Sequence, residues 1–391
     1  MKSILLRRAS ILAVPVVIAV TWTGFAIAQG APPPAPPAAE PAAPPPPAAP
    51  APVKYPTTTI NGYVEGAYHR TLGDTDYKQI LLTRAYDVAN GFQLHAAHFQ
   101  LEHAATEHVA GHIEFDAGAD AAINNFTHSA TGLGSEFDVP QAYAKLTNSG
   151  FTFTAGKFVT YDGIEVIGGP SNPTITRGFL FFLAEPVSHV GAKLHYATGP
   201  VDVGVGLVNG WDTNGVVYTG DNNDMKTGIF RIGVTPSPMF FAAVAGTYGV
   251  EQPGATSNPR LSLDLTGAVI PNDMITINFQ GNFGSEKAAP GPGAVPADGS
   301  WFGFGLQPVL KMGAAALGAR FEYFKDTKGT RTLVANDPSY INVTITPGYT
   351  FDGALTVRGE FRYDTSSEEV LGVDHNKKNQ STIALGASYM F

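Results

Sequence analysis

The last residues of the chain, 381–391, alternate strictly between two faces. One face is apolar and ends in aromatic rings, and it consists of Ser381, Ile383, Leu385, Ala387, Tyr389 and Phe391. A period of 2 with such a face is typical of a strand that has lipid on one side and a wetter interior on the other. A terminal strand that ends in Phe is also typical of bacterial outer-membrane barrels. The segment therefore predicts an all-β transmembrane barrel in the bacterial outer membrane.

An outer-membrane location requires export, and the N-terminus has the features of a signal peptide. Three basic residues, Lys2, Arg7 and Arg8, precede an apolar stretch over 11–20. Small residues at Ala26 and Ala28 then provide a cleavage site. We predict a signal peptide over 1–28.

The composition excludes several classes of protein. A formal net charge of −9 disfavours nucleic acid as a partner. The absence of cysteine excludes a disulfide framework. After residue 28, nothing resembles the long apolar helix that a helical membrane protein needs. Among exported proteins, a barrel in contact with outer-membrane lipid fits best, and nothing predicts a cofactor.

Residues 29–57 form a low-complexity segment with 13 prolines between Gln29 and Pro56. A proline- and alanine-rich stretch cannot form a core and favours the polyproline II conformation. We predict a periplasmic linker. It is either a passive tether or an arm that contacts peptidoglycan or a periplasmic protein.

From residue 58 to residue 391 the sequence becomes a series of short alternating runs. Short links alternate with longer polar ones, as in outer-membrane barrels with short periplasmic turns and long outer loops. The pattern predicts about sixteen antiparallel strands, at 58–70, 93–104, 109–118, 139–147, 151–158, 189–197, 201–209, 225–235, 239–249, 259–268, 273–283, 301–311, 315–325, 339–349, 354–364 and 380–391.

One face of many of these strands is densely charged. In 354–364, Leu355 and Phe361 share a side, while Arg358, Glu360 and Arg362 share the other. Charges this dense are costly against lipid or in a dry core, but they can face water. A barrel of about sixteen strands is wide enough for an aqueous channel. This pattern predicts a porin that passes small hydrophilic solutes or ions by diffusion.

The connection between the fifth and sixth predicted strands is unusually long, and it is the third long loop. It contains the apolar run 179–183, which should be buried, and four charged residues: Asp162, Glu165, Arg177 and Glu185. Loops of this length are usually functional or disordered. We predict that it folds inward and forms the constriction of the pore, as the third loop of general diffusion porins does.

The same region resembles the OmpL-like family of β-barrel porins. The shared pattern covers about 70 residues and includes Gly156, Lys157, Phe158, Gly163, Glu165, Pro170, Asn172, Arg177, Phe181, Pro186, His189 and Gly191. The chain departs from the pattern at Tyr161, where the family more often has proline, so the loop should start differently. The resemblance implies a porin fold more strongly than it implies a particular solute.

Charged residues on the predicted inner face are the candidate lumen residues: Lys193, Arg231, Arg320, Glu322, Arg358, Glu360 and Arg362. Acids of the long loop that face a basic wall would sort solutes by charge. Alternatively, pairs such as Arg320 with Glu322 only solvate and brace the wall.

Other functions have weaker support. His95, His98, His103, His108 and His112 crowd one hairpin, but no tight ligand spacing repeats, so we predict no metal site. The common catalytic motifs are absent, and we predict no catalytic residues and no enzyme activity. Two alternative functions are kept: an outer-membrane enzyme, and a plugged barrel that anchors the envelope through the linker. A homotrimer is compatible with the architecture, although no segment identifies an interface.

Overall fold

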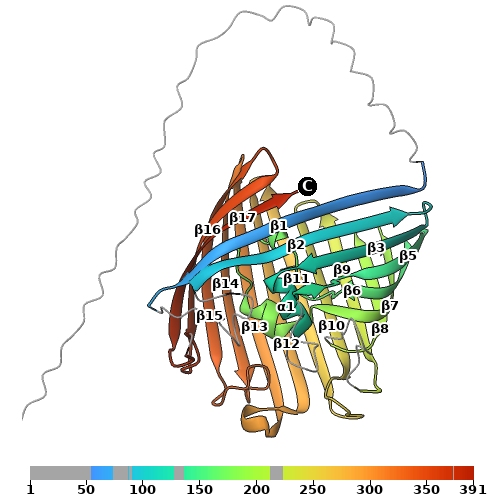
Figure 1. Ribbon diagram of the computed structural model, residues 1–391. Helices are drawn as coiled ribbons and strands as arrows, with labels where there is room; N and C mark the ends of the chain where they lie inside the picture. The colour runs from blue at the N-terminus through green and yellow to red at the C-terminus, as the bar shows by residue number, and fades with distance from the viewer. Residues whose placement is uncertain (1–53, 74–86, 88–89, 127–135, 212–222, 373) are drawn as a thin grey trace, which may run out of the picture. The chain divides into compact units, whose positions relative to one another are not determined.

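The computed structural model describes residues 54–73, 87, 90–126, 136–211, 223–372 and 374–391. The predicted signal peptide and nearly all of the predicted linker lie outside these residues, so both stay predictions. Residues 53–391 form one compact unit, which contains the whole sheet. Figure 1 shows this unit as a wall of strands.

Seventeen strands form a single antiparallel sheet. Sixteen of them make up a closed barrel, and the two-residue strand β4 is an addition to it. The strands are β1 (Thr57–Thr71), β2 (Asn90–Ala104), β3 (Val109–Ala117), β4 (Phe137–Asp138), β5 (Ala142–Asn148), β6 (Phe151–Val159), β7 (Ser188–Thr198), β8 (Val201–Val208), β9 (Thr227–Ser237), β10 (Phe240–Val250), β11 (Pro259–Asn272), β12 (Ile275–Pro290), β13 (Pro296–Met312), β14 (Ala315–Thr327), β15 (Ser339–Phe351), β16 (Leu355–Ser366) and β17 (Asn379–Met390). The predicted barrel of about sixteen strands is confirmed.

Two details between β3 and β5 differ from the prediction. The predicted strand 139–147 begins only at Ala142, and Phe137 and Asp138 form the separate strand β4. Pro140 lies at the interruption, where it cannot donate a backbone hydrogen bond to a neighbouring strand. In addition, a short helix, α1 (Ala119–Phe126), lies in the connection between the predicted strands 109–118 and 139–147.

The sheet closes on itself where its first and last strands meet. β1 pairs with β17 from Tyr63 opposite Met390 to Thr71 opposite Thr382. The chain terminus completes this seam, because Phe391 and Gly62 exchange backbone hydrogen bonds of 3.0 and 3.1 Å. The predicted terminal strand is therefore confirmed, and its final residue is part of the closure.

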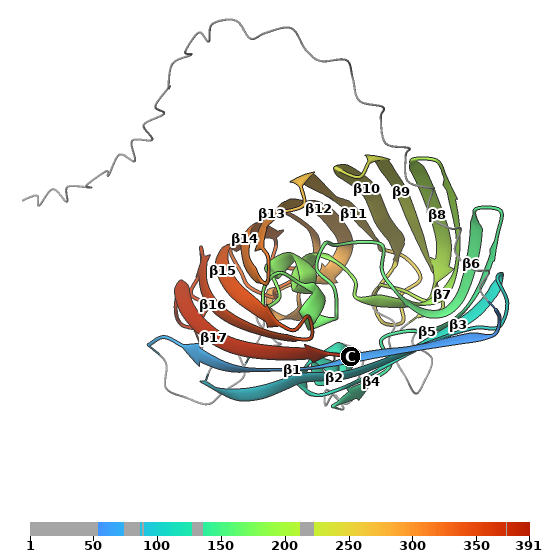
Figure 2. The ribbon, with the colours of Figure 1, turned by 90° about the horizontal axis from the view of Figure 1, so that it is seen from above.

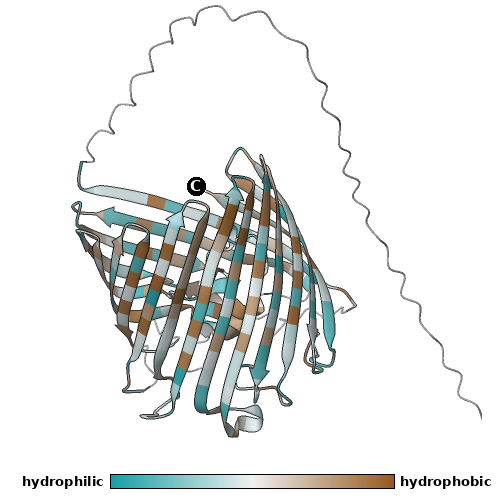
Figure 3. Ribbon diagram, turned by 180° about the vertical axis from the view of Figure 1, so that it is seen from behind, coloured by the Kyte–Doolittle hydropathy of each residue, from teal (hydrophilic) through white to brown (hydrophobic). Residues whose placement is uncertain are grey.

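The two faces of the wall have the predicted composition. On β17, Leu385 and Tyr389 are exposed on the outside, whereas Thr382 is buried inside. On β16, Phe361 is 46% exposed and Arg362 is fully buried. Figure 3 shows apolar residues recurring along the outside of the strands. Polar side chains thus line the inner face of the wall, as the lipid-facing pattern requires.

Connection lengths alternate around the barrel. Turns of a few residues join β2 to β3, β5 to β6 and β7 to β8, whereas long connections join β1 to β2, β3 to β5 and β6 to β7. None of the helices among the described residues has the length and the apolar character needed to cross a bilayer.

Candidate functional site

The long connection between β6 and β7 contacts the inner face of the wall. We call residues 160–187 the pore loop. Figure 2 shows this segment, in green, inside the ring of strands. Its hydrogen bonds include contacts with β11, β14 and β16 between residues that lie more than 100 positions apart in the sequence.

The first attachment is an ion pair between the pore loop and β14. The Arg320 guanidinium donates to the Glu165 carboxylate at 2.7 Å, and the same Nη1 donates to Thr174 Oγ1 at 2.8 Å. Glu165 also accepts from Gln307 Nε2 at 2.9 Å and from the backbone N–H of Gly178 at 2.6 Å. Both charged side chains are almost fully buried. A buried, multiply bonded pair of this kind holds the loop in one position, because moving it would leave charges unpaired.

Two carboxylates of the wall bind the backbone of the pore loop. Glu360 accepts from the N–H of Ile175 at 2.6 Å and from Thr176 Oγ1 at 2.5 Å. Glu322 accepts from the N–H of Phe179 at 2.8 Å. These acceptors satisfy backbone donors that the irregular loop leaves without partners in regular secondary structure.

Two more of the basic residues predicted for the lumen, Arg358 and Arg362, lie beneath the same loop. Arg358 donates to the carbonyl of Asn172 at 2.9 Å and to the carboxylate of Glu65. Arg362 donates to Asp364 at 2.8 Å and to the carbonyl of Arg177 at 2.5 Å. The structure therefore places Arg320, Arg358 and Arg362 in the contact between loop and wall, rather than facing open solvent.

The apolar run of the pore loop forms the centre of a small core. Leu180–Ala184 adopt one π-helical turn. Phe179, Leu180, Leu183 and Ala184 pack with aromatic residues of the wall and of neighbouring loops, namely Trp211, Trp301, Phe324 and Tyr340. The predicted burial of this run is confirmed for Phe179, Leu180, Phe181 and Leu183, while Phe182 is only partly buried.

Two acids of the pore loop are buried close to a third carboxylate. Asp162 and Glu185 face Asp264 of β11, and Gln280 donates to Glu185 at 2.7 Å and to Asp264 at 2.8 Å. Burial, with the negative charge of Asp264 as the second cause, raises the pKa of both Asp162 and Glu185 well above the ordinary carboxyl range. Both side chains therefore favour the neutral form.

This cluster predicts a stability that depends on pH. Because the folded-state pKa values are raised, the stabilisation is complete below the ordinary carboxyl pKa of about 4 and is lost as pH rises through the raised values. The double substitution Asp162→Asn with Glu185→Gln should flatten this dependence. Urea unfolding in detergent between about pH 4 and pH 8 measures it, with exposed Glu107→Gln as the control. Equal slopes for wild type and the double variant would contradict the assignment.

The opposite side of the interior is open. A cavity of about 640 Å³ lies along β5 to β9. Among its lining residues are Tyr161 of the pore loop and the basic residues Lys145, Lys193, His195 and Arg231. Lys193 and Arg231, both predicted lumen residues, therefore line open space.

The charges in this cavity are not equally neutralised. Asp202 accepts from Arg231 Nε at 2.8 Å and contacts His195 Nε2 at 3.1 Å, and Lys145 donates to Glu102 at 3.0 Å. Lys193 differs, because its ammonium lies 4.2 Å from the ring centre of Phe158 and 4.5 Å from that of Tyr161. Within the described part of the chain, no carboxylate lies within ion-pair distance of Lys193.

A second cavity, of about 540 Å³, lies next to the first. Both are lined by Gln141, Val159, Thr160 and Tyr161. The second extends past Glu165 and Glu185 to residues Asn61, Gly62 and Phe391 at the seam of the barrel. Together the two cavities run beside the start of the pore loop.

Several residues of this region were missed by sequence reasoning. Lys145, His195 and Asp202 lie on the inner face of strands that had been predicted, so strand alternation would have found them. Tyr161 was noted only as a departure from a family pattern. It lies near the start of the pore loop and lines both cavities.

Comparison with known proteins agrees with this architecture. Residues 57–391 match the family described as "Putative beta-barrel porin-2, OmpL-like". No curated protein matches the sequence. Similar solved structures include an anion-selective porin from Comamonas acidovorans, at 10% identity and TM-score 0.59, over 86% of this chain and 100% of that chain. The outer membrane channel DcaP of Acinetobacter baumannii is similar at 12% identity and TM-score 0.57, over 86% and 97% of the two chains. OmpT of Vibrio cholerae, an outer membrane protein in its trimer form, is similar at 12% identity and TM-score 0.54, over 86% and 100%.

At these identities the solved structures support the fold alone, while the family match covers most of the chain. The closed sixteen-stranded barrel and its polar inner face are the architecture expected of the porin family that the sequence matches. The chain belongs to the OmpL-like β-barrel porin family and is an outer-membrane diffusion channel.

Proposed function

We propose that the channel passes small hydrophilic solutes beside the pore loop, along β5 to β9, and that it prefers anions. The observation that carries the proposal is the pair of cavities that share four lining residues at the start of the loop. The loop fills the side of the barrel next to β11 to β16, so the path lies on the other side. Passive transport of this kind requires no catalytic group.

The charge preference follows from which groups remain uncompensated along this path. The acidic side chains beside the second cavity are paired or neutral: Glu165 binds Arg320, Glu114 binds His112 and Gln141, and burial favours neutral Asp162 and Glu185. Lys193 in the first cavity has two aromatic rings as its neighbours instead. A cation at a narrow point of a water-filled path attracts anions and repels cations.

Single-channel recording in a planar bilayer tests the proposal. Folding is first verified by heat-modifiable gel migration. Uniform conductance steps, with a reversal potential of the sign expected for anions in a salt gradient, are the expected result. A cation-selective reversal potential would contradict the charge assignment. Silence from a folded barrel would contradict the open path and favour the plugged, anchoring barrel.

Homotrimer formation is a further part of the proposal. The fold is shared with an outer membrane protein recorded as a trimer. Chemical crosslinking in outer-membrane vesicles should give a species of three chains, whereas a single-chain species at all crosslinker concentrations would contradict it. Contact of residues 29–57 with peptidoglycan stays a prediction from composition.

A further inference from the structure

Two histidines on neighbouring strands face each other at a site that neither cavity includes. His69 lies near the end of β1, and His95 lies near the start of β2. Their Nε2 atoms are 2.8 Å apart, and both side chains are buried. Neither residue is needed to explain diffusion through the pore.

A β-bulge directs His95 into this position. Along the β1–β2 ladder, Glu65 pairs with Ala96 and the next residue, Gly66, pairs with Leu94, so His95 is the extra residue. His95 and Ala96 are consequently both buried, although they are adjacent, while Leu94 is exposed. Bulges re-aim a side chain and occur often beside functional sites. Strict alternation would have placed His95 and Ala96 on opposite faces.

A carboxylate from the α1 helix orients His95. The Nδ1 atom of His95 lies 2.8 Å from Oδ1 of Asp120, which is also buried. This contact leaves Nε2 of the same ring directed toward His69. A histidine held through one nitrogen by a carboxylate, with the other nitrogen directed at a shared point, is the arrangement that commonly surrounds metal-binding histidines.

A second carboxylate supplies a third ligand. Asp87 is the one residue between 74 and 89 that the structure describes, and its side chain is buried. The three side chains that meet here are His69, Asp87 and His95. Each offers one ligand atom, and these three atoms lie within 4.8 Å of one another. We propose that these three residues bind a divalent first-row transition metal ion, with Asp120 as a positioning residue.

The donor set selects the class of metal. Two imidazoles and one carboxylate suit Zn²⁺ and its neighbours in the first transition row, whereas Ca²⁺ and Mg²⁺ prefer oxygen donors. In the metal-free state one Nε2–H donates to the other Nε2. Two nitrogens on a tetrahedral zinc ion are about 3.3 Å apart, from bonds of about 2.0–2.1 Å. The rings therefore need to separate by about half an ångström, and the metal replaces the shared proton.

The site is connected to the pore loop through Asp120. Oδ2 of Asp120 lies 3.8 Å from Nη2 of Arg177, whose guanidinium also donates to backbone carbonyls of the loop at Ile175 and Ile167. A metal bound to His95 would thus fix β1, β2 and α1 together, next to the segment that narrows the pore. The expected consequence is a more stable barrel in the presence of the metal.

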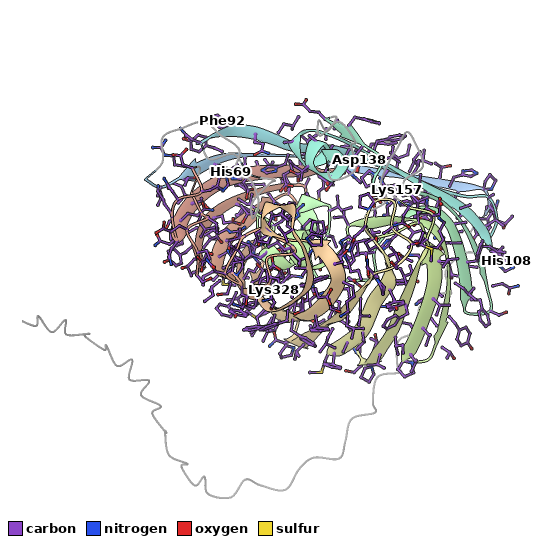
Figure 4. The ribbon with its side chains drawn as sticks, turned by 90° about the horizontal axis from the view of Figure 1, so that it is seen from below. His69, Phe92, His108, Asp138, Lys157 and Lys328 are labelled. Carbon is purple, nitrogen blue, oxygen red and sulfur yellow. The ribbon has the colours of Figure 1, made fainter. Side chains whose placement is uncertain are left out.

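Other histidines of this wall are the alternative metal ligands, and they also provide the control variants. His98 contacts Asp116 at 2.7 Å, and His112 contacts Glu114 at 2.8 Å. Among the described residues, the His69 cluster is the one group in which three ligand atoms gather this closely. Figure 4 shows His69 and the exposed His108 at opposite sides of the barrel.

Equilibrium dialysis of the exported, folded chain against Zn²⁺, after treatment with a chelator, tests the proposal. One ion per barrel is expected. His69→Gln and His95→Gln should each weaken binding more than about 100-fold, because losing a ligand exceeds the 10–100-fold effect of an outer-shell partner. Asp120→Asn should weaken Zn²⁺ binding by a factor within that 10–100-fold range, and His108→Gln should bind Zn²⁺ like wild type.

Cobalt provides a readout that does not depend on the stability of the variants. Co²⁺ bound to wild type should give the visible absorption of a low-symmetry site containing nitrogen ligands, and Zn²⁺ should displace it. Asp120→Asn, which keeps all three ligands, should alter that spectrum. Absence of a stoichiometric ion from wild type would overturn the proposal. The proposal would also be overturned if His112→Gln abolished metal binding while His69→Gln and His95→Gln left it intact.

Discussion

Replacing Arg320 with methionine should lower the free energy of unfolding by about 3–5 kcal/mol, the effect of removing one partner of a buried ion pair. The guanidinium binds Glu165 and Thr174 of the pore loop and Asn342 of β15, and it is completely buried. Its loss leaves the Glu165 carboxylate buried without its cation. The pore loop should therefore detach, and single-channel recordings should show larger and noisier steps.

Two further variants separate this effect from a general loss of stability. Lys287→Met removes an exposed ion pair with Asp298, and it should leave the free energy of unfolding nearly unchanged because solvent screens the pair. Adding Glu165→Gln to Arg320→Met should restore part of the lost stability, because the uncompensated buried charge is removed. Urea unfolding in detergent measures these three variants and the single substitution Glu165→Gln, which the test of additivity requires. If the two substitutions prove additive, Arg320 and Glu165 do not hold the loop together.

The fold could be predicted from sequence because lipid and lumen impose opposite requirements on alternate residues. That rule identified strands such as β16, where Phe361 faces outward and Arg362 inward. It failed where the backbone departs from alternation. The bulge at His95 and the interruption at Pro140 shift the pattern by one residue, and the α1 helix is too short to show a clear helical period.

The site was harder to predict, because partners far apart in sequence decide what each charge does. Alternation placed Arg320, Arg358 and Lys193 on one inner surface. It did not indicate which of them the pore loop would cover. Glu165 lies 155 positions from Arg320, and only the folded chain shows that this loop acid meets the late strands and leaves β5 to β9 open. The contacts of Arg320 and Arg358 with the pore loop agree with the interpretation of a braced wall, whereas charge selection along β5 to β9 stays a prediction.

Lys193→Glu should reverse the charge at the open side of the channel and lower the anion-to-cation permeability ratio by about 5- to 10-fold. A unit charge about 6 Å from a passing ion in water changes its energy by about 0.7 kcal/mol, or roughly threefold in local concentration. The substitution changes the charge by two units and acts oppositely on anions and cations, while screening by salt reduces the effect. Reversal potentials in a salt gradient measure the ratio directly.

The location of the charge, rather than the net charge of the protein, should decide the outcome. Lys311→Glu makes the same change at an exposed position on β13, outside both cavities, and should leave the ratio nearly unchanged. Arg358→Gln removes a charge that lies beneath the pore loop and pairs with Glu65. It should mainly affect stability, because a solute that passes along β5 to β9 does not approach it. A shift in selectivity for Arg358→Gln that equals or exceeds the shift for Lys193→Glu would place the path on the other side of the loop.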